Sequence, residues 1–294
     1  MKTISITAMR RPELLARLFD TLLANDLSGY TIAVAIEPSE RTREVLALCQ
    51  VRLSGRDHRI VVNDAVLGVR ANPYHLLRRV FEDGSAFNLY LEEDLEIAPD
   101  TTRLAEWYVA NHRPEWLCLN LLAGPCGSAA MLSDPGHPDE LVAARTFNSL
   151  GFAVRREEWH RHLEPIWMGG MPRSATRAPP RMQQWGWDWS IHGYLAQHRD
   201  KLVSIQPILA RATHTGRLGT SVTPEFHDQA FAGLPLADGT ATGYALTGHA
   251  ALPHRVRSLL NAQAELTAHR VAQSWVEPYV DLIKRLRRPF GRKT

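Results

Sequence analysis

The N-terminal hundred residues alternate short apolar runs with longer segments of helical periodicity. Residues 30–36 (YTIAVAI) form a continuous apolar run of strand length, and residues 3–8 also follow a strand pattern. Between them, Pro12 stands where the first turn of a helix tolerates proline, and leucines recur after it at helical spacing. The same alternation predicts helices over 41–53 and 73–82 and strands over 59–62 and 87–91. Such a pattern indicates a mostly parallel sheet with helices on both faces.

The pattern becomes less regular in the second half of the chain. A helix after Asp100 and an apolar strand over 116–122 continue the alternation. Residues 124–139 and 169–184 are rich in Gly, Pro and Ser, and they predict long loops of the kind that is functional or disordered in compact domains. A helical pattern runs from about residue 253 to residue 286, and residues 284–293 then contain six basic side chains and no acidic one.

Composition narrows the class of protein. The 34 basic and 31 acidic residues leave a net charge of only +3, so bulk charge does not indicate a nucleic-acid partner. Three cysteines without a CxxC pair indicate reduced thiols, and neither a signal peptide nor a membrane-spanning run is apparent, so we expect a cytoplasmic protein. The basic C-terminal tail is either a solvated terminus or a contact with an anionic membrane surface through Leu286 and Phe290.

Three consecutive acids, Glu92, Glu93 and Asp94, follow the apolar strand over 87–91. Ligands of open parallel sheets bind beyond the carboxyl ends of the strands, where these acids are expected to lie. Neighbouring carboxylates repel one another, and a bound cation relieves the repulsion. Hard ions such as Mg²⁺ and Mn²⁺ prefer oxygen ligands and are often held by one or two carboxylates together with substrate phosphates. The alternative is an ordinary acidic surface cluster.

The segment around this triplet, LYLEEDLEIAPD, resembles the metal-binding segment of GT-A glycosyltransferases. It is most similar to that of the N-acetylglucosaminyltransferase I family, whose strand ends in Glu-Asp-Asp followed by Leu-Glu-Val-Ala-Pro-Asp. Three further blocks resemble this family in the same order, at residues 150–167 (LGF…LEPIW), 187–189 (WDW) and 216–229 (GRLG…FHDQ). The resemblance implies a GT-A fold, which is Rossmann-like with a mostly parallel sheet flanked by helices, here with a C-terminal helical extension.

The resemblance also implies roles for individual residues. Asp94 becomes the metal ligand, Glu93 lies where the family contacts the ribose, and Glu92 lies where it faces the donor sugar. Glu93 replaces the family's central Asp. After the first strand the family uses an Arg to hold the nucleotide, and the register leaves Arg10 and Arg11 both open.

Four more residues are candidates on the donor side. Glu37 follows the second strand where the family places an acid near the uracil, or it is an ordinary exposed loop carboxylate. Asn72, just before the predicted helix at 73–82, is a further donor-binding candidate. His214 would join the metal shell, as a late His does in many GT-A enzymes, or serve as a structural histidine. Arg217 would offer a cation to the diphosphate, or pair with a nearby acid.

Asp188 is the candidate catalytic base. Inverting transfer requires a base that takes the acceptor's hydroxyl proton, and a carboxylate surrounded by Trp185, Trp187 and Trp189 would have a raised pKa. The family's general base lies in this position. The alternative is that Asp188 only caps the helix that follows it.

Together these features predict an inverting glycosyltransferase that uses Mn²⁺ or Mg²⁺ and a UDP-sugar, with GlcNAc suggested by the resemblance alone. Residues 1–122 would bind the nucleotide sugar, 123–250 the acceptor, and 251–294 form the basic helical extension. The acceptor would be a glycan, a small molecule or a modified DNA base. The alternatives are a metal-dependent phosphoester hydrolase or nucleotidyltransferase, and a nucleotide-sugar-binding module without activity.

Overall fold

The computed structural model describes residues 1–123, 132–168, 187–198, 201–219, 222–262, 264–266, 268–269 and 272. The second half of the predicted loop at 124–139 lies within this part. Its first eight residues, the predicted loop at 169–184, Trp185 and the basic tail lie outside it. No helix in the described part is long and apolar enough to span a membrane.

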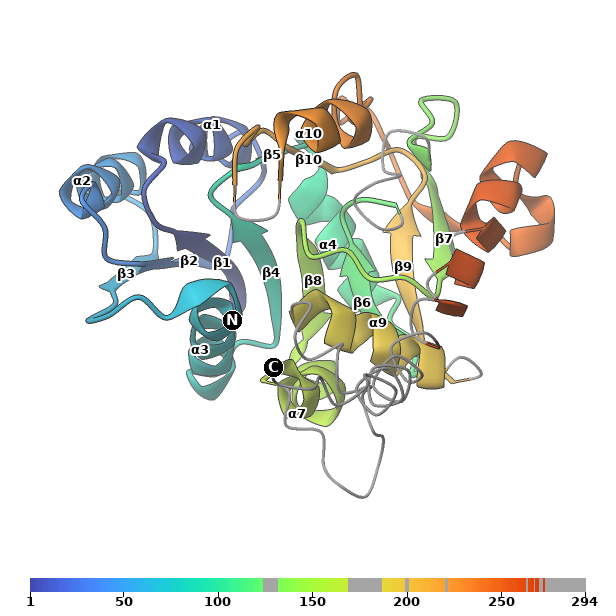
Figure 1. Ribbon diagram of the computed structural model, residues 1–294, viewed down its shortest axis with the longest axis horizontal. Helices are drawn as coiled ribbons and strands as arrows, with labels where there is room; N and C mark the ends of the chain where they lie inside the picture. The colour runs from blue at the N-terminus through green and yellow to red at the C-terminus, as the bar shows by residue number, and fades with distance from the viewer. Residues whose placement is uncertain are drawn as a thin grey trace, which may run out of the picture.

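The first half of the chain forms regular strand–helix units (Figure 1). Its strands are β1 (Lys2–Ala8), β2 (Tyr30–Ile36), β3 (His58–Val62) and β4 (Phe87–Glu92). Its helices are α1 (Pro12–Leu22), α2 (Thr42–Arg52) and α3 (Gly68–Glu82). β1 pairs in parallel with β2 and β4, and β2 pairs in parallel with β3. The predicted alternation of this half is therefore confirmed.

The second half extends the same sheet with both parallel and antiparallel pairs. Its strands are β5 (Leu95–Ile97), β6 (Trp116–Asn120), β7 (Glu140–Ala144), β8 (Phe152–Arg155), β9 (Val203–Pro207), β10 (Ala212–His214) and β11 (Ala245–Leu246). Within the described residues, nine strands form one mostly parallel sheet in the order β11-β7-β9-β6-β8-β4-β1-β2-β3. β8 lies antiparallel between β4 and β6, while β5 and β10 form a separate antiparallel pair.

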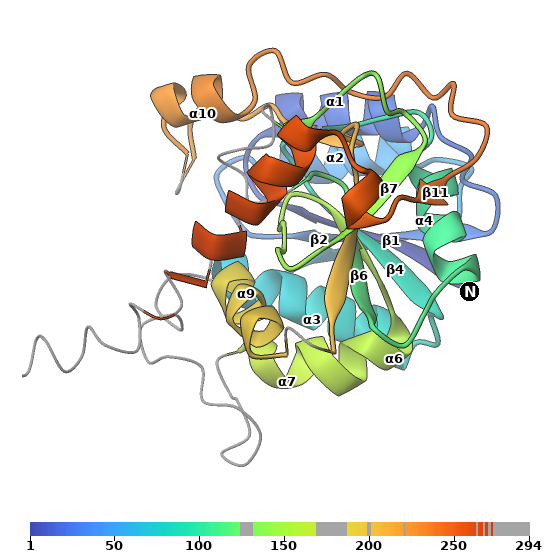
Figure 2. The ribbon, with the colours of Figure 1, turned by 90° about the vertical axis from the view of Figure 1, so that its right-hand side faces the viewer.

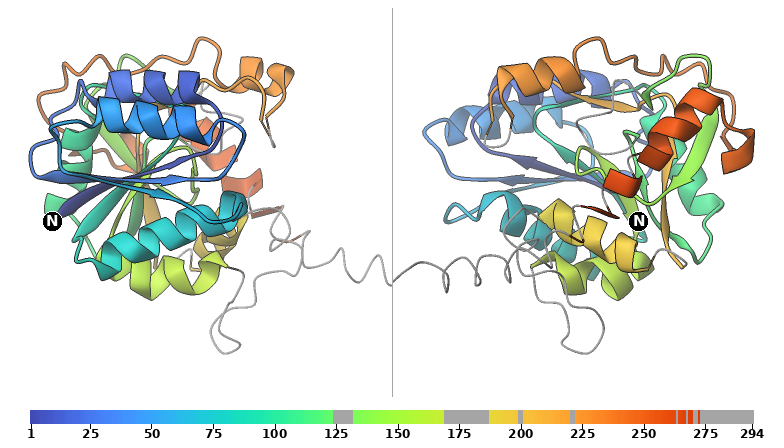
Figure 3. Two further views of the ribbon diagram at one scale, coloured as in Figure 1. Left: turned by 90° about the vertical axis from the view of Figure 1, so that its left-hand side faces the viewer. Right: turned by 45° about the vertical axis from the view of Figure 1, so that its right-hand side comes forward.

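Helices cover both faces of the sheet (Figures 2 and 3). The remaining helices are α4 (Thr101–Ala110), α6 (Arg156–Glu158), a π-helix η2 (Trp159–Leu163), α7 (Glu164–Trp167), α9 (Trp187–Gln197), α10 (Pro224–Ala230) and a 3₁₀ helix η3 (His249–Ala251). Residues 254–262 are also helical, at the start of the predicted C-terminal helix. One apolar core packs α1, α2 and α4 against the sheet, and a second packs α3, η2, α7 and α9 against the other face.

The start of α3 differs from the prediction. The helix was expected to begin at about Pro73. It begins five residues earlier, at Gly68, with Pro73 inside it. The Glu37 carboxylate accepts hydrogen bonds from the backbone amides of Leu67 (2.8 Å) and Gly68 (2.9 Å). A side chain from another element thus provides the acceptor that the free amides of a helix start require.

Candidate active site

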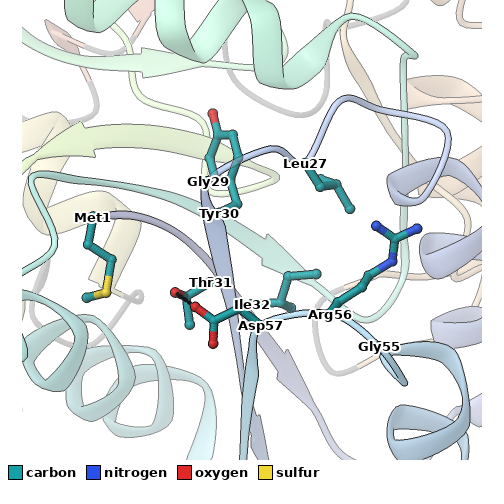
Figure 4. A pocket seen from close by; sticks show the side chains of 9 residues that line it. All are labelled: Met1, Leu27, Gly29, Tyr30, Thr31, Ile32, Gly55, Arg56 and Asp57. Atoms are coloured by element: carbon teal, nitrogen blue, oxygen red, sulfur yellow. Dashed lines mark hydrogen bonds between the residues drawn. The ribbon is translucent and has the colours of Figure 1, made fainter.

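A cavity of about 190 Å³ opens at the carboxyl ends of β1, β2 and β4. It is lined by six of the predicted donor-binding residues, Arg10, Arg11, Glu37, Asn72, Glu92 and Glu93. A second cavity, of about 350 Å³, lies at the amino ends of β2 and β3 and is lined by none of the predicted site residues (Figure 4). Because ligands of open parallel sheets bind at the carboxyl ends of the strands, the first cavity is the candidate active site.

The strand register brings these side chains together. The Cα of Thr7 in β1 pairs with that of Glu92 in β4. Beyond the strands, the Glu93 amide donates to Thr7 O (3.0 Å) and the Glu37 amide donates to Ala8 O (2.8 Å). Residues more than eighty positions apart in the chain therefore meet at one edge of the sheet.

Glu93 lies in the wall of the cavity with both carboxylate oxygens hydrogen-bonded. Its Oε2 accepts from the Met9 amide (2.7 Å), and its Oε1 accepts from Arg11 Nε (2.7 Å). Glu93 is almost fully buried. Its carboxylate therefore orders the turn after β1, in addition to any contact it makes with a ligand.

Asp94 lies beside Glu93 and contacts two basic side chains through a single oxygen. Asp94 Oδ2 is 2.8 Å from Arg11 Nη2 and 2.9 Å from His214 Nε2. The β5–β10 pairing explains the second contact, because it aligns His214 with Leu95, the residue after Asp94. The Thr215 amide also donates to Asp94 O (2.8 Å). The structure thus brings the two predicted metal ligands together.

Gly216 lies against Arg11, His214 and Asp94, and the sequence analysis did not predict this position for it. A Cβ built on it would lie 3.0 Å from Arg11 Nη1, 3.1 Å from His214 Cε1 and 3.2 Å from Asp94 Oδ2. Any side chain here would crowd all three groups, so glycine permits their approach. The only signal in the sequence was its place in the GRLG block.

The acids in this cluster have different proton affinities. Burial by itself would raise the pKa of Asp94, but the hydrogen bond and charge of His214 and the charge of Arg11 outweigh it and lower that pKa. Burial, with the repulsion of Asp94, raises the pKa of Glu92 to about 8. Glu92 accepts a hydrogen bond from Tyr90 Oη (3.1 Å). One carboxyl group therefore stays charged at neutral pH, while its neighbour largely holds a proton.

Glu37 and Asn72 line the same cavity as Glu92 and Glu93. Glu37 is buried and holds the first turn of α3, so the reading of it as an exposed loop carboxylate is wrong. Asn72 lies in that helix and accepts a hydrogen bond through Oδ1 from Asn63 Nδ2 (2.9 Å). Both side chains line the cavity from fixed positions.

Asp188 lies in the first turn of α9, next to a cluster of aromatic rings. The ring of Trp187 stacks on Trp167 with 4.0 Å between centroids and meets the edge of Tyr90 at 6.2 Å. Burial raises the pKa of Asp188 to about 6, although backbone amides at residues 188 and 189 and the charge of Arg70 act in the opposite direction. The Asp188 carboxylate also raises the pKa of Glu92, so the two acids lie within electrostatic range of each other.

One contact on this side was not expected from the sequence. The Trp167 indole donates a hydrogen bond through Nε1 to Arg70 O (2.9 Å), which joins the aromatic cluster to the first turn of α3. α9 begins at Trp187, so Asp188 lies inside the first helical turn and not at the N-cap position. Its carboxylate accepts hydrogen bonds from backbone amides at residues 188 and 189, which is compatible with the proton-accepting role proposed for it.

Arg217 takes the second of its two predicted roles in this structure. Its Nη2 lies 2.6 Å from Asp228 Oδ2, and both side chains are largely exposed. The neighbouring Leu218 and Gly219 line the cavity, whereas Arg217 does not. A contact between Arg217 and a ligand there would require the exposed ion pair to open.

The residues around Asp94 fit a divalent cation. Asp94 Oδ1 is buried and has no hydrogen-bond partner among the described residues. A carboxylate with one oxygen free of hydrogen bonds and the other in contact with an imidazole suits Mn²⁺ or Mg²⁺ when phosphate oxygens complete the shell. The described part of the chain contains no group of three or more His, Cys, Asp or Glu side chains placed to hold a metal. A cation at Asp94 would therefore depend on ligands supplied by the substrate.

The fold is that of nucleotide-sugar glycosyltransferases. The chain is similar to the mannosyltransferase PcManGT from Pyrobaculum calidifontis, solved in complex with GDP-Man and Mn²⁺, with a TM-score of 0.50 and 14% identity over 93% of this chain and 73% of that one. It is also similar to S. aureus TarS 1-349, with a TM-score of 0.48 and 12% identity over 74% of this chain and 61% of that one. The chain thus spans less than two thirds of the TarS structure. No family model and no curated protein matches the chain. The predicted GT-A fold is confirmed.

Proposed function

We propose that this protein is an inverting, metal-dependent glycosyltransferase that moves a sugar from a UDP-sugar to a hydroxyl acceptor. One observation carries the proposal: a single cavity joins Glu92 and Glu93 of the acidic triplet to the arginines after β1, and one of these, Arg11, also contacts Asp94. UDP-GlcNAc is the donor that the resemblance favours. The GDP-Man and Mn²⁺ bound to PcManGT show the kind of ligand pair that this fold accommodates in another protein.

The donor's nucleotide would lie between the turn after β1 and the first turn of α3. Arg10, Arg11 and Arg217 are the cations that we assign to its phosphates, and Glu37 and Asn72 hold the wall beside its nucleoside. Asp94 and His214 would hold Mn²⁺ or Mg²⁺, which neutralises the charge that develops on the leaving diphosphate. Residues 1–122 would thus form the donor half, and residues 123–250 the acceptor half.

Asp188 and Glu92 would act on the two sugars. Asp188, ionised above pH about 6, accepts the proton of the acceptor hydroxyl as its oxygen attacks the anomeric carbon. Glu92, protonated near neutral pH, donates a hydrogen bond to the donor sugar, where the resemblance places it. The acceptor we expect is a glycan or a small molecule, with a DNA base as a further candidate. A peripheral membrane contact through the basic tail at residues 284–293 and a cytoplasmic location remain expectations of the sequence.

The experiment is calorimetric titration with a panel of nucleotide sugars, with and without Mn²⁺. We expect a UDP-sugar to bind in the presence of Mn²⁺ and chelation with EDTA to abolish most of the binding. Asp94→Asn keeps the shape of the side chain and removes its charge, and we expect it to weaken Mn²⁺-dependent binding about 100-fold, at the upper end for disturbed metal sites.

The two alternatives, a phosphoester hydrolase and a nucleotide-sugar-binding module without activity, predict different results when the same protein preparation is assayed. Failure of every UDP-sugar to bind would refute the proposal. Release of phosphate from simple nucleotides without an acceptor would favour the phosphoester hydrolase. Tight donor binding without transfer to any acceptor in a broad panel would favour the binding module.

A further inference from the structure

Arg11 joins two of the three acids in the triplet. It follows β1 and precedes Pro12, the first residue of α1, so its backbone is held between two regular elements. Its Nε is 2.7 Å from Glu93 Oε1 and its Nη2 is 2.8 Å from Asp94 Oδ2. The Arg11 side chain is 31% exposed, whereas each of the two carboxylates is 5% exposed. One guanidinium with access to solvent thus neutralises two buried acids.

The position of this guanidinium conflicts with that of a metal. Asp94 Oδ2 already contacts two basic side chains, while Asp94 Oδ1 is buried and unpaired among the described residues. A divalent cation at Asp94 would lie close to the Arg11 charge and would be repelled by it. A guanidinium is also a planar donor that binds a phosphate as readily as a carboxylate. Arg11 therefore has two competing partners when a donor diphosphate is present.

The surroundings of Arg11 allow its side chain to move. Gly216 faces Arg11 Nη1, where a Cβ would lie only 3.0 Å away. Arg11 itself lines the cavity, so its side chain already borders the space that a ligand would occupy. Glu93 remains tied to the Met9 amide whether or not Arg11 leaves.

We propose that Arg11 is a placeholder cation: it neutralises Asp94 before the donor binds, opposes metal binding at that stage, and moves to the donor diphosphate when donor and metal arrive together. The inference rests on the proposed function, because it takes Asp94 as the metal ligand. The placeholder role predicts a coupling between the binding of Mn²⁺ and the binding of the donor diphosphate. The protein alone binds Mn²⁺ weakly, a diphosphate strengthens that binding, and by thermodynamic reciprocity Mn²⁺ strengthens diphosphate binding by the same factor.

The test measures free Mn²⁺ by electron paramagnetic resonance in titrations of the full chain, with and without UDP. Arg11→Gln removes the placeholder charge. Arg17→Gln is the matched control, because Arg17 carries the same charge on α1 but donates to Glu96 (2.6 Å) outside the triplet. Without UDP, we expect Arg11→Gln to bind Mn²⁺ about tenfold more tightly than the wild type, and UDP to add correspondingly less, within the usual range of coupling between two ligands. Arg17→Gln should match the wild type.

Two outcomes separate the inference from the function on which it rests. If the wild type binds Mn²⁺ more tightly with UDP but Arg11→Gln binds Mn²⁺ alone no better than the wild type, the placeholder role is refuted and the proposed function stands. If the wild type takes up no Mn²⁺ even with UDP, the metal site itself is refuted. Should Arg11→Gln fail to fold, Arg11→Met removes the charge that repels the cation and keeps an unbranched side chain. Its affinity for Mn²⁺ alone should then exceed that of the wild type, and an unchanged affinity would overturn the inference.

Discussion

Asp94 and Asp188 are two carboxyl groups that both act on Glu92 through their charge, and the side chains around them differ. Asp94 lies beside His214 and Arg11, and its contacts with these side chains lower its pKa in spite of burial. Asp188 follows a tryptophan in an aromatic cluster, and burial raises its pKa to about 6. The pKa values of two chemically identical side chains are thus shifted in opposite directions.

This difference in pKa suits the two groups to the different tasks that we propose for them. A carboxylate that stays ionised is suited to hold a cation, and a carboxyl group that titrates near neutral pH is suited to exchange a proton. Pairs of acids whose environments separate their pKa values are typical of enzymes that need both tasks in one cleft. The contrast supports the proposed roles of Asp94 and Asp188 independently of the resemblance that first suggested them.

Asp188→Asn, which alters one of the two contrasted acids, is expected to have the largest effect, and this effect is on kcat. The amide preserves the size of the side chain and can still accept hydrogen bonds from the backbone amides, but it cannot take the proton of the acceptor hydroxyl. We expect kcat to fall by a factor of about 10²–10⁴, as for the loss of a general base, with the donor's Kd little changed. Steady-state kinetics with the best acceptor, together with donor titration, would measure both. Full activity of the variant would show that Asp188 is not the catalytic base, and only its hydrogen bonds with backbone amides would remain as a role.

A smaller effect is expected from pH. Because the folded-state pKa of Asp188 is raised to about 6, the base is protonated below that value and ionised above it. At saturating donor and acceptor, we therefore expect kcat to fall about tenfold for each pH unit below 6. A profile of kcat from acid to neutral pH would show this limb, and the limb should disappear in the residual activity of Asp188→Asn. A flat profile through pH 6 would contradict the assignment.

The smallest effect is expected from Arg217→Ala. Its guanidinium pairs with Asp228 at the surface, in contrast to Arg11, which pairs with buried acids. Exposed pairs contribute little, so we expect the free energy of unfolding to change by less than about 1 kcal/mol in a urea titration. Because Arg217 would have to leave Asp228 to reach a donor, we expect the donor's Kd to rise less than about tenfold. A larger rise would contradict this prediction and show that Arg217 contributes to diphosphate binding more than an exposed charge does.

The regular part of the fold could be read from the sequence because its signals are local. The apolar runs that form β1, β2 and β4 and the helical spacing after Pro12 identify their elements without reference to the rest of the chain. The start of α3 was misplaced because it depends on Glu37, which lies thirty residues earlier in the chain. The spacing of apolar and polar residues over a few positions does not indicate a contact between segments thirty residues apart.

The candidate site was predictable to a similar extent. Six of the proposed donor-binding residues line one cavity. The sequence left Arg10 and Arg11 as alternatives, and the structure shows that Arg11 is the one bonded to Glu93 and Asp94. Nothing in the pattern around Gly216 indicated that its missing side chain makes room for Arg11 and His214.

The sequence by itself determined the strand–helix alternation, the position of the acidic triplet after an apolar strand, and the set of residue types available for chemistry. Only the tertiary structure decided which cation neutralises which acid, that His214 reaches Asp94 through the β5–β10 pairing, and that Asp188 lies within electrostatic range of Glu92. The physical reason is the range of the interactions. Periodicity reflects neighbours along the chain, whereas ion pairing and pKa shifts depend on distances and burial that arise only when remote segments pack together.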